Sequence, residues 1–308
     1  MRSTTRHSRP LATTMVARLH LAIAGWLLLV LVAGATAASD FPPIGVRGQS
    51  HPGKFVWFDL VTSDLAAERR FYGEVFGWQF RVIDGAPGSY TLIEDDGHEV
   101  GGMFEHAPPP DATRAARWLA LISVRDPAAA VRYVEQHGGT VIAPPATLVG
   151  RGTHALLRDP EGAVFGVLKS ESGDPADTPV DEGDFYWLDL FARDPLRAAE
   201  FYRGLAGFDV SLREQPPGGW RVVLAAGGYA RAGIAPLPAP IRQPGWLPYV
   251  LVDEVAATLA KVRAAGGQVL LEPRAELLNG NLAVFADPGG GVLGILSWAA
   301  ANAAGSAP

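Results

Sequence analysis

Two stretches of this sequence repeat each other and decide the fold: FVWFDLVTSDLAAERRFYGEVFGW begins at Phe55, and FYWLDLFARDPLRAAEFYRGLAGF begins at Phe185. Trp57 of the first stretch corresponds to Trp187 of the second, a shift of about 130 residues. The same shift relates further pairs, namely Asp59/Asp189, Asp64/Asp194, Tyr72/Tyr202 and Gly77/Gly207. Matching order and matching spacing indicate an internal duplication.

The duplication predicts how the chain is divided. Later motifs also recur, since Asp159-Pro160 is repeated as Asp287-Pro288. The acidic stretch SESGDPADTPVDEGD, which contains Pro and Gly, is typical of a linker between the copies. In chain order we predict a lead-in, a first domain, a linker, a second domain and a tail: residues 38–54, 55–169, 170–184, 185–298 and 299–308.

Each copy also contains a weaker half-repeat. Residues 55–61 are typical of a strand, Asp64 can cap the helix that follows, and Gly77 suits the end of that helix. Three strands are predicted next, and the same order recurs after a second capped helix that begins at Asp126-Pro127. We therefore predict an α+β fold of two tandem domains, each made of paired βαβββ modules with curved mixed sheets and outer helices.

The N-terminal residues 1–37 are typical of an export signal. Four Arg residues and no acidic residue precede the apolar run LAIAGWLLLVLVAG, and Ala35-Thr36-Ala37 offers a small-residue cleavage site. The alternative is an uncleaved membrane anchor, which would be the chain's only membrane contact. A cleaved signal would place the domains outside the cytoplasm, in the periplasm or secreted, whereas the alternative would leave the protein anchored to the membrane by its N-terminal segment.

Composition narrows the functional classes further. The 308 residues carry a net charge of −6, which argues against nucleic-acid binding because that function needs a basic surface. The sequence has no Cys, so disulfides, thiolate nucleophiles and Cys-ligated metals are ruled out.

The motifs resemble those of the vicinal-oxygen-chelate superfamily, which includes glyoxalase I, extradiol dioxygenases and bleomycin-resistance proteins. The resemblance rests on the Asp, Phe-Tyr and Gly that follow the first strand of each copy and on the Asp-Pro-x-Gly turns at Asp159 and Asp287. It covers about residues 55–169 and 185–298, which are nearly all of the predicted mature chain. It implies cupped sheets that hold a divalent metal through His, Gln or Glu side chains.

The positions that the resemblance assigns to metal ligands carry no suitable side chain. In the two copies they are Trp57, Leu119 and Gly166, and Trp187, Leu247 and Gly294. Divalent metals need nitrogen, oxygen or thiolate donors, so we predict no metal and no cofactor. A non-standard site would have to use His98, Glu99, His106, His137 or His154; we interpret these instead as surface or turn residues.

Strand alternation predicts what the cups hold instead. Phe55, Trp57 and Asp59 should share the concave face, with Val56, Phe58 and Leu60 toward the helices. Indole rings and carboxylates could bind a ligand, or they could form a core in which each Asp pairs with Arg81, Arg151 or Arg221. The candidate ligand-binding residues are Trp57, Asp59, Trp118, His154, Trp187, Asp189 and Trp246, and for Trp118 and Trp246 core packing is the alternative.

Three functions are compatible with these residues. The first is an exported, metal-free protein that binds small apolar or aromatic molecules. The second is a metal-dependent lyase, isomerase or dioxygenase with non-standard ligands, and the third is an interaction module without a ligand. The sequence leaves enzymatic activity uncertain and favours a protein that is not a metal-dependent enzyme. The two copies can pair with each other, so we expect a pseudo-dimeric monomer or a homo-oligomer.

Overall fold

The computed structural model describes residues 41–45, 48–84, 89–107, 115–214, 219–239 and 241–297. The predicted export signal and C-terminal tail lie outside these ranges. Within them, no helix is both long enough and apolar enough to cross a membrane.

The first copy forms one eight-stranded mixed sheet, here sheet A, with strand order β2-β3-β4-β1-β5-β8-β7-β6. Its first module comprises β1 (Phe55–Thr62), α2 (Leu65–Phe76), β2 (Gln79–Val82), β3 (Thr91–Asp95) and β4 (His98–Glu105). Its second module comprises β5 (Arg117–Ser123), α3 (Pro127–Gln136), β6 (Thr140–Leu148), β7 (Gly152–Arg158) and β8 (Val164–Ser170).

The second copy forms sheet B with the same topology, in the order β10-β11-β12-β9-β13-β16-β15-β14. Its first module comprises β9 (Phe185–Ala192), α4 (Pro195–Ala206), β10 (Asp209–Glu214), β11 (Trp220–Ala226) and β12 (Tyr229–Pro236). Its second comprises β13 (Gly245–Val252), α5 (Val255–Ala264), β14 (Gln268–Leu271), the short 3-10 helix η2 (Leu278–Gly280), β15 (Leu282–Ala286) and β16 (Val292–Ser297). The predicted α+β fold, with four βαβββ modules, is confirmed.

Local sequence signals set the helix boundaries as predicted. The Asp64 side chain accepts a hydrogen bond of 2.9 Å from the backbone N–H of Ala67 at the start of α2. Gly77 ends that helix with φ 85°, a left-handed conformation that favours glycine. Asp126 and Asp194 cap α3 and α4 in the same way.

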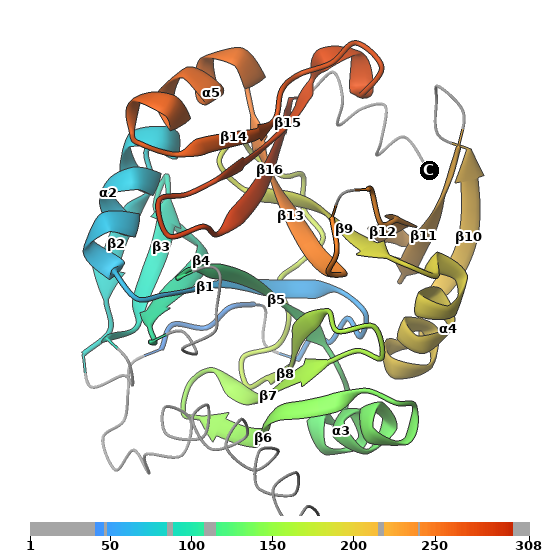
Figure 1. Ribbon diagram of the computed structural model, residues 1–308. Coiled ribbons are helices and arrows are strands. Elements are labelled where there is room, and N and C mark those ends of the chain that lie inside the picture. Colours follow the sequence, from blue (N-terminus) through green and yellow to red (C-terminus); the bar gives the residue numbers. More distant parts are fainter. Residues whose placement is uncertain are drawn as a thin grey trace, which may run out of the picture.

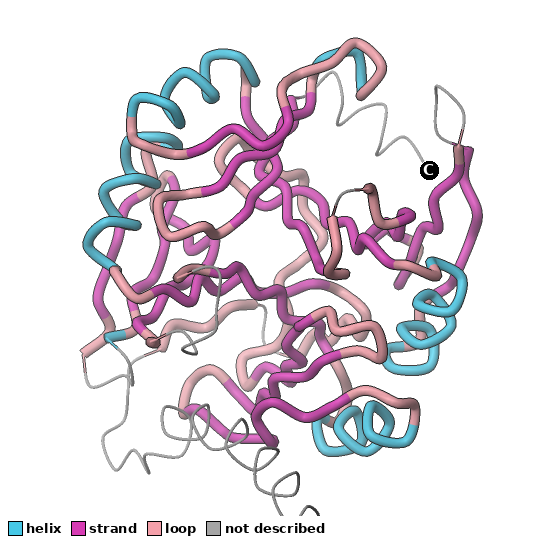
Figure 2. Tube along the Cα trace, viewed as in Figure 1, coloured by secondary structure: helices cyan, strands magenta, loops and turns pink. Residues whose placement is uncertain are grey.

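The helices bring the two copies together. Helix α2 packs on α5 and α3 packs on α4, so each helix of one copy meets a helix of the other. Figure 1 shows these two pairs on opposite sides of the molecule, and Figure 2 shows the helices outside the strands. Buried residues of both copies form one hydrophobic cluster between the sheets.

The recurring Phe-Tyr and Asp-Pro motifs meet across this interface. The Tyr72 hydroxyl donates to Asp287 of the second copy at 2.7 Å, and it accepts a hydrogen bond of 2.8 Å from Trp118 Nε1. In the pseudo-equivalent arrangement, Tyr202 donates to Asp159 at 3.1 Å and accepts from Trp246 at 3.0 Å. These motifs therefore hold the duplicated domains together.

The prediction for Phe55 and Val56 was wrong. Phe55 lies in the cluster between the sheets, where its ring is 5.1 Å from that of Trp246, whereas Val56 packs with Trp57 on the concave side. A register shift between Phe55 and Trp57 in the β1–β5 pairing interrupts the alternation. One extra residue at a bulge reverses the faces of the residues before it.

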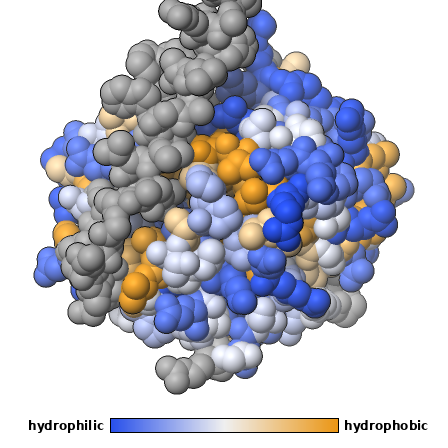
Figure 3. Space-filling view, turned by 90° about the horizontal axis from the view of Figure 1, so that it is seen from below, coloured by the Kyte–Doolittle hydropathy of each residue, from blue (hydrophilic) through white to orange (hydrophobic). Residues whose placement is uncertain are grey.

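The exterior contrasts with this interior. Figure 3 shows a face that is mostly hydrophilic, with apolar residues gathered in its middle.

Candidate functional site

The concave face of sheet A, here cup 1, is built on the central strands. Trp57 and Asp59 lie on β1, and Trp57 pairs across the strands with Leu121 of β5. Tyr90 precedes β3, and Arg151 lies in the turn between β6 and β7. The structure thus brings residues from both modules of the copy to one site.

Three of these side chains form a closed hydrogen-bonded group. The Tyr90 hydroxyl donates to Asp59 Oδ1 at 2.6 Å, and Trp57 Nε1 lies 3.0 Å from the same oxygen and 2.8 Å from the Tyr90 hydroxyl. A Cβ on Gly102 would lie 2.0 Å from the Tyr90 hydroxyl oxygen, so this arrangement needs glycine there. Burial raises the pKa of Asp59, although the Tyr90 hydrogen bond and the charge of Arg151 oppose that shift.

Arg151 lies over this group and is itself covered. Its guanidinium carbon is 3.9 Å from the centre of the Trp57 ring and 5.1 Å from that of Phe41. Arg151 is only 4% exposed, yet its Nη1 and Nη2 atoms are buried and have no hydrogen-bond partner. Phe41 is 6% exposed and meets the Tyr90 ring edge-on at 5.0 Å, so the segment before the first domain closes cup 1.

His154 contributes a second buried polar atom without a partner to cup 1, while its ring also bonds to the Gly152 backbone. It lies on β7, where it pairs with Leu168 of the cup 1 cluster, and its Nδ1 atom is buried and unbonded. Burial, aided by the charge of Arg151, lowers the pKa of His154 to about 4. The imidazole is therefore neutral at neutral pH.

The concave face of sheet B, here cup 2, contains the same residue types, but its arginine is paired with its carboxylate, and among its described side-chain atoms only Arg221 Nε is buried without a partner. Trp187 Nε1 donates to Asp189 Oδ1 at 3.0 Å. Arg221 Nη2 lies 2.9 Å and 2.8 Å from the two oxygens of Asp189, and the Tyr249 hydroxyl also bonds to this carboxylate. Asp189 and Arg221 therefore form an ion pair, which is one of the pairings predicted if the cups are cores.

Both cups contain Trp, Asp, Tyr and Arg, but the Tyr and the Arg come from different positions in the two copies. Gly102 pairs with Asp59 as Gly233 pairs with Asp189. Gly102 also pairs with Leu92 on β3, and Gly233 with Val223 on β11. Tyr90 and Arg221 each lie two residues before these partners, so Arg221 occupies the position that Tyr90 has in cup 1. Likewise Tyr249 lies opposite Trp187, where cup 1 has Leu121. The duplication thus conserves Trp and Asp in position, whereas Tyr and Arg differ.

Comparison with known proteins agrees with this architecture. The family model described as the glyoxalase/bleomycin resistance protein/dioxygenase superfamily matches residues 54–167 and 185–294. This chain belongs to that superfamily.

Relatives of this superfamily protein include a putative glyoxylase, CFP32, from Mycobacterium tuberculosis (strain CDC 1551 / Oshkosh). It is 31% identical over 252 residues, which cover 81% of this chain and 97% of the relative. The anthracycline biosynthesis protein DnrV of Streptomyces peucetius is 30% identical over 255 residues, covering 78% and 91%. The Mn(II)-bound glyoxalase from Novosphingobium aromaticivorans shares the fold, with a TM-score of 0.55, 20% identity, and coverage of 80% of this chain and 83% of its own.

The residues of the cups do not fit the divalent metal that the superfamily implies. Trp57, Leu119 and Gly166 carry no donor for a metal, and neither do Trp187, Leu247 and Gly294. A Cβ on Gly166 would lie 2.7 Å from Leu121, and one on Gly294 would lie 2.1 Å from Tyr249, so apolar or aromatic side chains fill this space. Among the described residues, no three His, Cys, Asp or Glu side chains gather as a metal site would require.

The three other histidines considered as candidate metal ligands, His98, His106 and His137, lie apart from cup 1. His98 contacts Asp184 of the linker at 2.8 Å, and His137 stacks on Tyr133 at the end of α3. The backbone N–H of His106 bonds to Thr62 at the end of β1. Glu99 instead pairs with Arg81, which also binds Glu94 on the surface.

The structure places only some of the predicted ligand-binding residues in the cups. Trp57, Asp59 and His154 line cup 1, and Trp187 and Asp189 line cup 2. Trp118 and Trp246 instead face the helices and bond to Tyr72 and Tyr202, which agrees with the core-packing alternative. Whether any of these residues binds a ligand stays a prediction.

The sequence analysis missed Phe41, Tyr90 and Tyr249 as members of the cups. Tyr249 lies two residues after Leu247 on the same strand, so alternation could have found it. No local pattern could have identified Phe41 or Tyr90, because their positions depend on how distant segments fold back.

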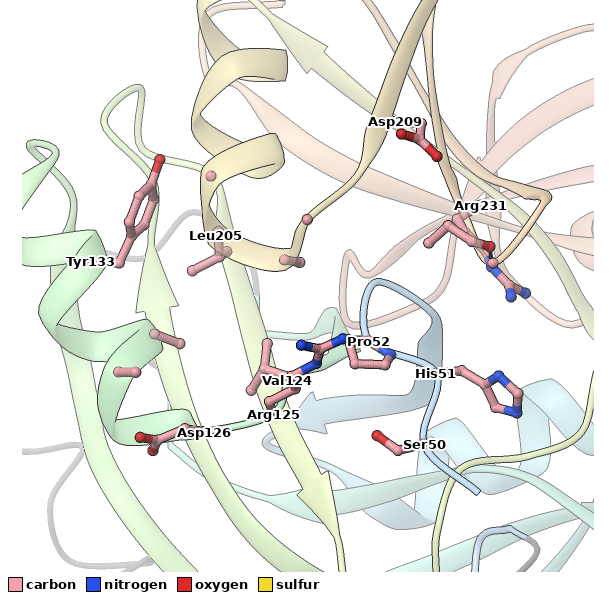
Figure 4. A pocket seen from close by; sticks show the side chains of 17 residues that line it. Ser50, His51, Pro52, Val124, Arg125, Asp126, Tyr133, Leu205, Asp209 and Arg231 are labelled. Atoms are coloured by element: carbon pink, nitrogen blue, oxygen red, sulfur yellow. Dashed lines mark hydrogen bonds between the residues drawn. The ribbon is translucent and has the colours of Figure 1, made fainter. Parts of the chain in front are cut away.

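A separate cavity of about 670 Å³ lies at the seam of α3 and α4. Figure 4 shows Tyr133 and Leu205 on one side and Asp209 and Arg231 on the other. A difference between the two copies accounts for this cavity. Helix α4 ends with the small residue Ala206, whereas α2 ends with Phe76 at the equivalent position. The Phe76 ring fills the opposite seam, 4.7 Å from the ring of Trp78.

Proposed function

We propose that this protein is an exported, metal-independent member of the superfamily that binds small apolar or aromatic molecules in its cups. One observation carries the proposal. The positions that the resemblance assigns to metal ligands carry Trp, Leu and Gly in both copies, while the same faces present aromatic rings beside a carboxylate and an arginine. Aromatic walls with a few convergent polar groups are typical of small-molecule sites.

The two cups differ in how open they are. The cup 2 cluster around Trp187 is bordered by half-buried apolar side chains, among them Leu282, Val284 and Val292. Cup 1 is covered by Phe41. We therefore expect ligands to enter cup 2 directly and cup 1 only when the Phe41 segment moves aside.

The proposed export rests on residues 1–37, with their basic start, apolar run and small-residue site. N-terminal sequencing of the protein recovered from the culture medium or periplasm tests it. A mature chain starting near Ala38 supports export with cleavage. Recovery of the uncleaved chain in the membrane would support the anchor, and recovery in the cytoplasm would contradict export.

Ligand binding is tested by tryptophan fluorescence with a panel of aromatic compounds. We expect quenching that EDTA does not change, and a loss of quenching in Trp187→Leu or Trp57→Leu. Trp220→Phe is the control, because Trp220 is 41% exposed and lies outside both cups.

Metal analysis of the purified protein separates the alternatives. Stoichiometric, tightly held iron, manganese, nickel or zinc would contradict the proposal and favour a metal-dependent enzyme with unusual ligands. Absence of quenching by every compound, in a correctly folded protein, would favour an interaction module.

A further inference from the structure

The most unusual feature of cup 1 is an arginine that is buried without a partner. Arg151 is 4% exposed, and neither terminal nitrogen of its guanidinium has a hydrogen-bond partner. Buried hydrogen-bond donors are normally satisfied, and leaving those of a charged group unsatisfied is strongly unfavourable. Such a group indicates that its hydrogen-bond acceptor comes from a bound molecule and not from the protein itself.

The neighbouring carboxylate does not satisfy Arg151. Asp59 Oδ1 already accepts from Tyr90 and Trp57, and the charge of Arg151 acts on Asp59 although the terminal nitrogens of Arg151 make no hydrogen bond to it. In cup 2 the corresponding charges meet, since Arg221 lies 2.8 Å from Asp189. Both cups contain the same four residue types, but buried terminal nitrogens without a partner are specific to the arginine of cup 1, because only Nε of Arg221 is in that state.

A second unbonded atom lies in the same cup. His154 Nδ1 is buried without a partner, and the charge of Arg151 acts on this ring. Arg151 Nη1 and Nη2 and His154 Nδ1 thus make a small polar site within the apolar lining of cup 1. In the neutral ring the bond to the Gly152 backbone uses the N–H of the other nitrogen, so Nδ1 is an acceptor and can complement a hydroxyl of the ligand.

We propose that cup 1 selects aromatic molecules that carry a carboxylate, and that Arg151 binds this group through its two terminal nitrogens. The inference rests on the proposed function, because it assumes that cup 1 binds small molecules. The planar guanidinium matches a carboxylate in a two-pronged geometry while it stays stacked on Trp57.

Phe41 shows where the ring of the ligand would lie. Its ring packs edge-on against Tyr90 at 5.0 Å and lies 5.1 Å from the Arg151 guanidinium carbon. An aromatic ligand that displaces Phe41 would regain both contacts and would add the charge that Arg151 lacks. Phe41 thus acts as a replaceable cover over this site.

The test compares two probes of the same size, 1-naphthoate and 1-naphthylmethanol, by calorimetry on the full chain. We expect naphthoate to bind about 10- to 100-fold more tightly, the range of a charge-assisted pair. Arg151→Met should abolish this preference and leave naphthylmethanol binding intact. Phe41→Ala should tighten naphthoate binding several-fold, because the ligand no longer competes with the phenyl ring.

Two further variants control the experiment. Arg81→Gln removes an exposed arginine of the same sheet and should keep the preference. Arg151→Lys keeps the charge and should retain part of the preference even if Arg151→Met proves unstable. Equal affinities of the wild type for both probes would overturn the carboxylate inference and leave the proposed function intact. Absence of binding by either probe and by every other aromatic compound would overturn both.

Discussion

Glu68 is a buried carboxyl at the interface between the copies. It is 1% exposed, its Oε1 accepts from the backbone N–H of Gly289 at 3.2 Å, and its Oε2 has no partner. Burial, together with the nearby Asp287, raises the pKa of Glu68 to about 8. The pseudo-equivalent position on α4 is Ala198, so the other seam has no acid at this position.

This acid should make stability depend on pH. The folded state keeps a proton on Glu68 that the unfolded chain releases above about pH 4.5, so stability falls as the pH rises from there to about 8. Glu68→Gln removes that loss. We expect the free energy of unfolding of Glu68→Gln, relative to that of the wild type, to be about 1–3 kcal/mol higher at pH 8 than at pH 5. Urea unfolding at the two pH values measures this difference. An equal difference at both pH values would show that Glu68 is ionised when folded.

Each interface tyrosine serves as donor and acceptor at once. Tyr72→Phe leaves both Trp118 Nε1 and Asp287 without a partner in the buried interface, so we expect a loss of about 1–3 kcal/mol in the free energy of unfolding. Tyr202→Phe is the matched variant in the other seam, where the distances are 3.1 and 3.0 Å. Denaturant unfolding measures both, and a change below 0.5 kcal/mol in each would contradict their role.

The four helices start and end by the same local rules, but the seams they form are not equivalent. Helix α2 ends with Phe76, whose ring contacts Trp78, Tyr72 and Phe285. Helix α4 ends with Ala206, and the cavity of about 670 Å³ lies beside it. One pair of helices is therefore better packed than the other.

Filling the cavity should stabilise the protein. We expect Ala206→Phe to raise the free energy of unfolding by about 0.5–2 kcal/mol, the usual gain for filling a cavity. Phe76→Ala, the reciprocal change, should lower it by about 1–3 kcal/mol because it opens the other seam. Thermal unfolding of the two variants is the measurement. A destabilising Ala206→Phe would show that the cavity cannot accept the ring.

The two copies are also joined through the linker. Asp177 of this segment binds Lys54 ahead of the first sheet at 2.8 Å and Arg231 of the second sheet at 2.5 Å. These hydrogen bonds and charges hold the pKa of Asp177 well below its usual range. Asp174, 2% exposed, accepts from His51 and Ser123 and ties the lead-in to the first sheet. The linker therefore fixes the copies relative to each other.

Breaking this ion-pair group should weaken the whole molecule. Asp177→Asn leaves two cations largely buried without a counter-charge, so we expect a loss of about 1–3 kcal/mol at pH 7. The wild-type contribution is complete above the ordinary Asp pKa and is lost as the pH falls through the lower folded pKa. The difference between the variant and the wild type should therefore shrink below about pH 4 in urea unfolding. A constant difference would contradict this.

The sequence by itself determined the duplication, the four βαβββ modules and the helix caps, and the lack of ligands at the superfamily's metal positions stays a prediction from it. These features depend on residue spacing and on interactions within a few residues, so local patterns report them. Alternation placed Trp57 and Asp59 together but failed at Phe55, because a bulge in the pairing with β5 shifts the faces.

Only the tertiary structure decided which distant groups meet. It placed Phe41 and Tyr90 beside Arg151, assigned Arg221 rather than Arg81 or Arg151 to an ion pair with a cup carboxylate, and moved Trp118 and Trp246 to the helix side. The physical reason is that such contacts depend on strand register and domain packing. Arg81, Arg151 and Arg221 were all possible partners for a cup carboxylate, and nothing in their local sequence distinguishes them.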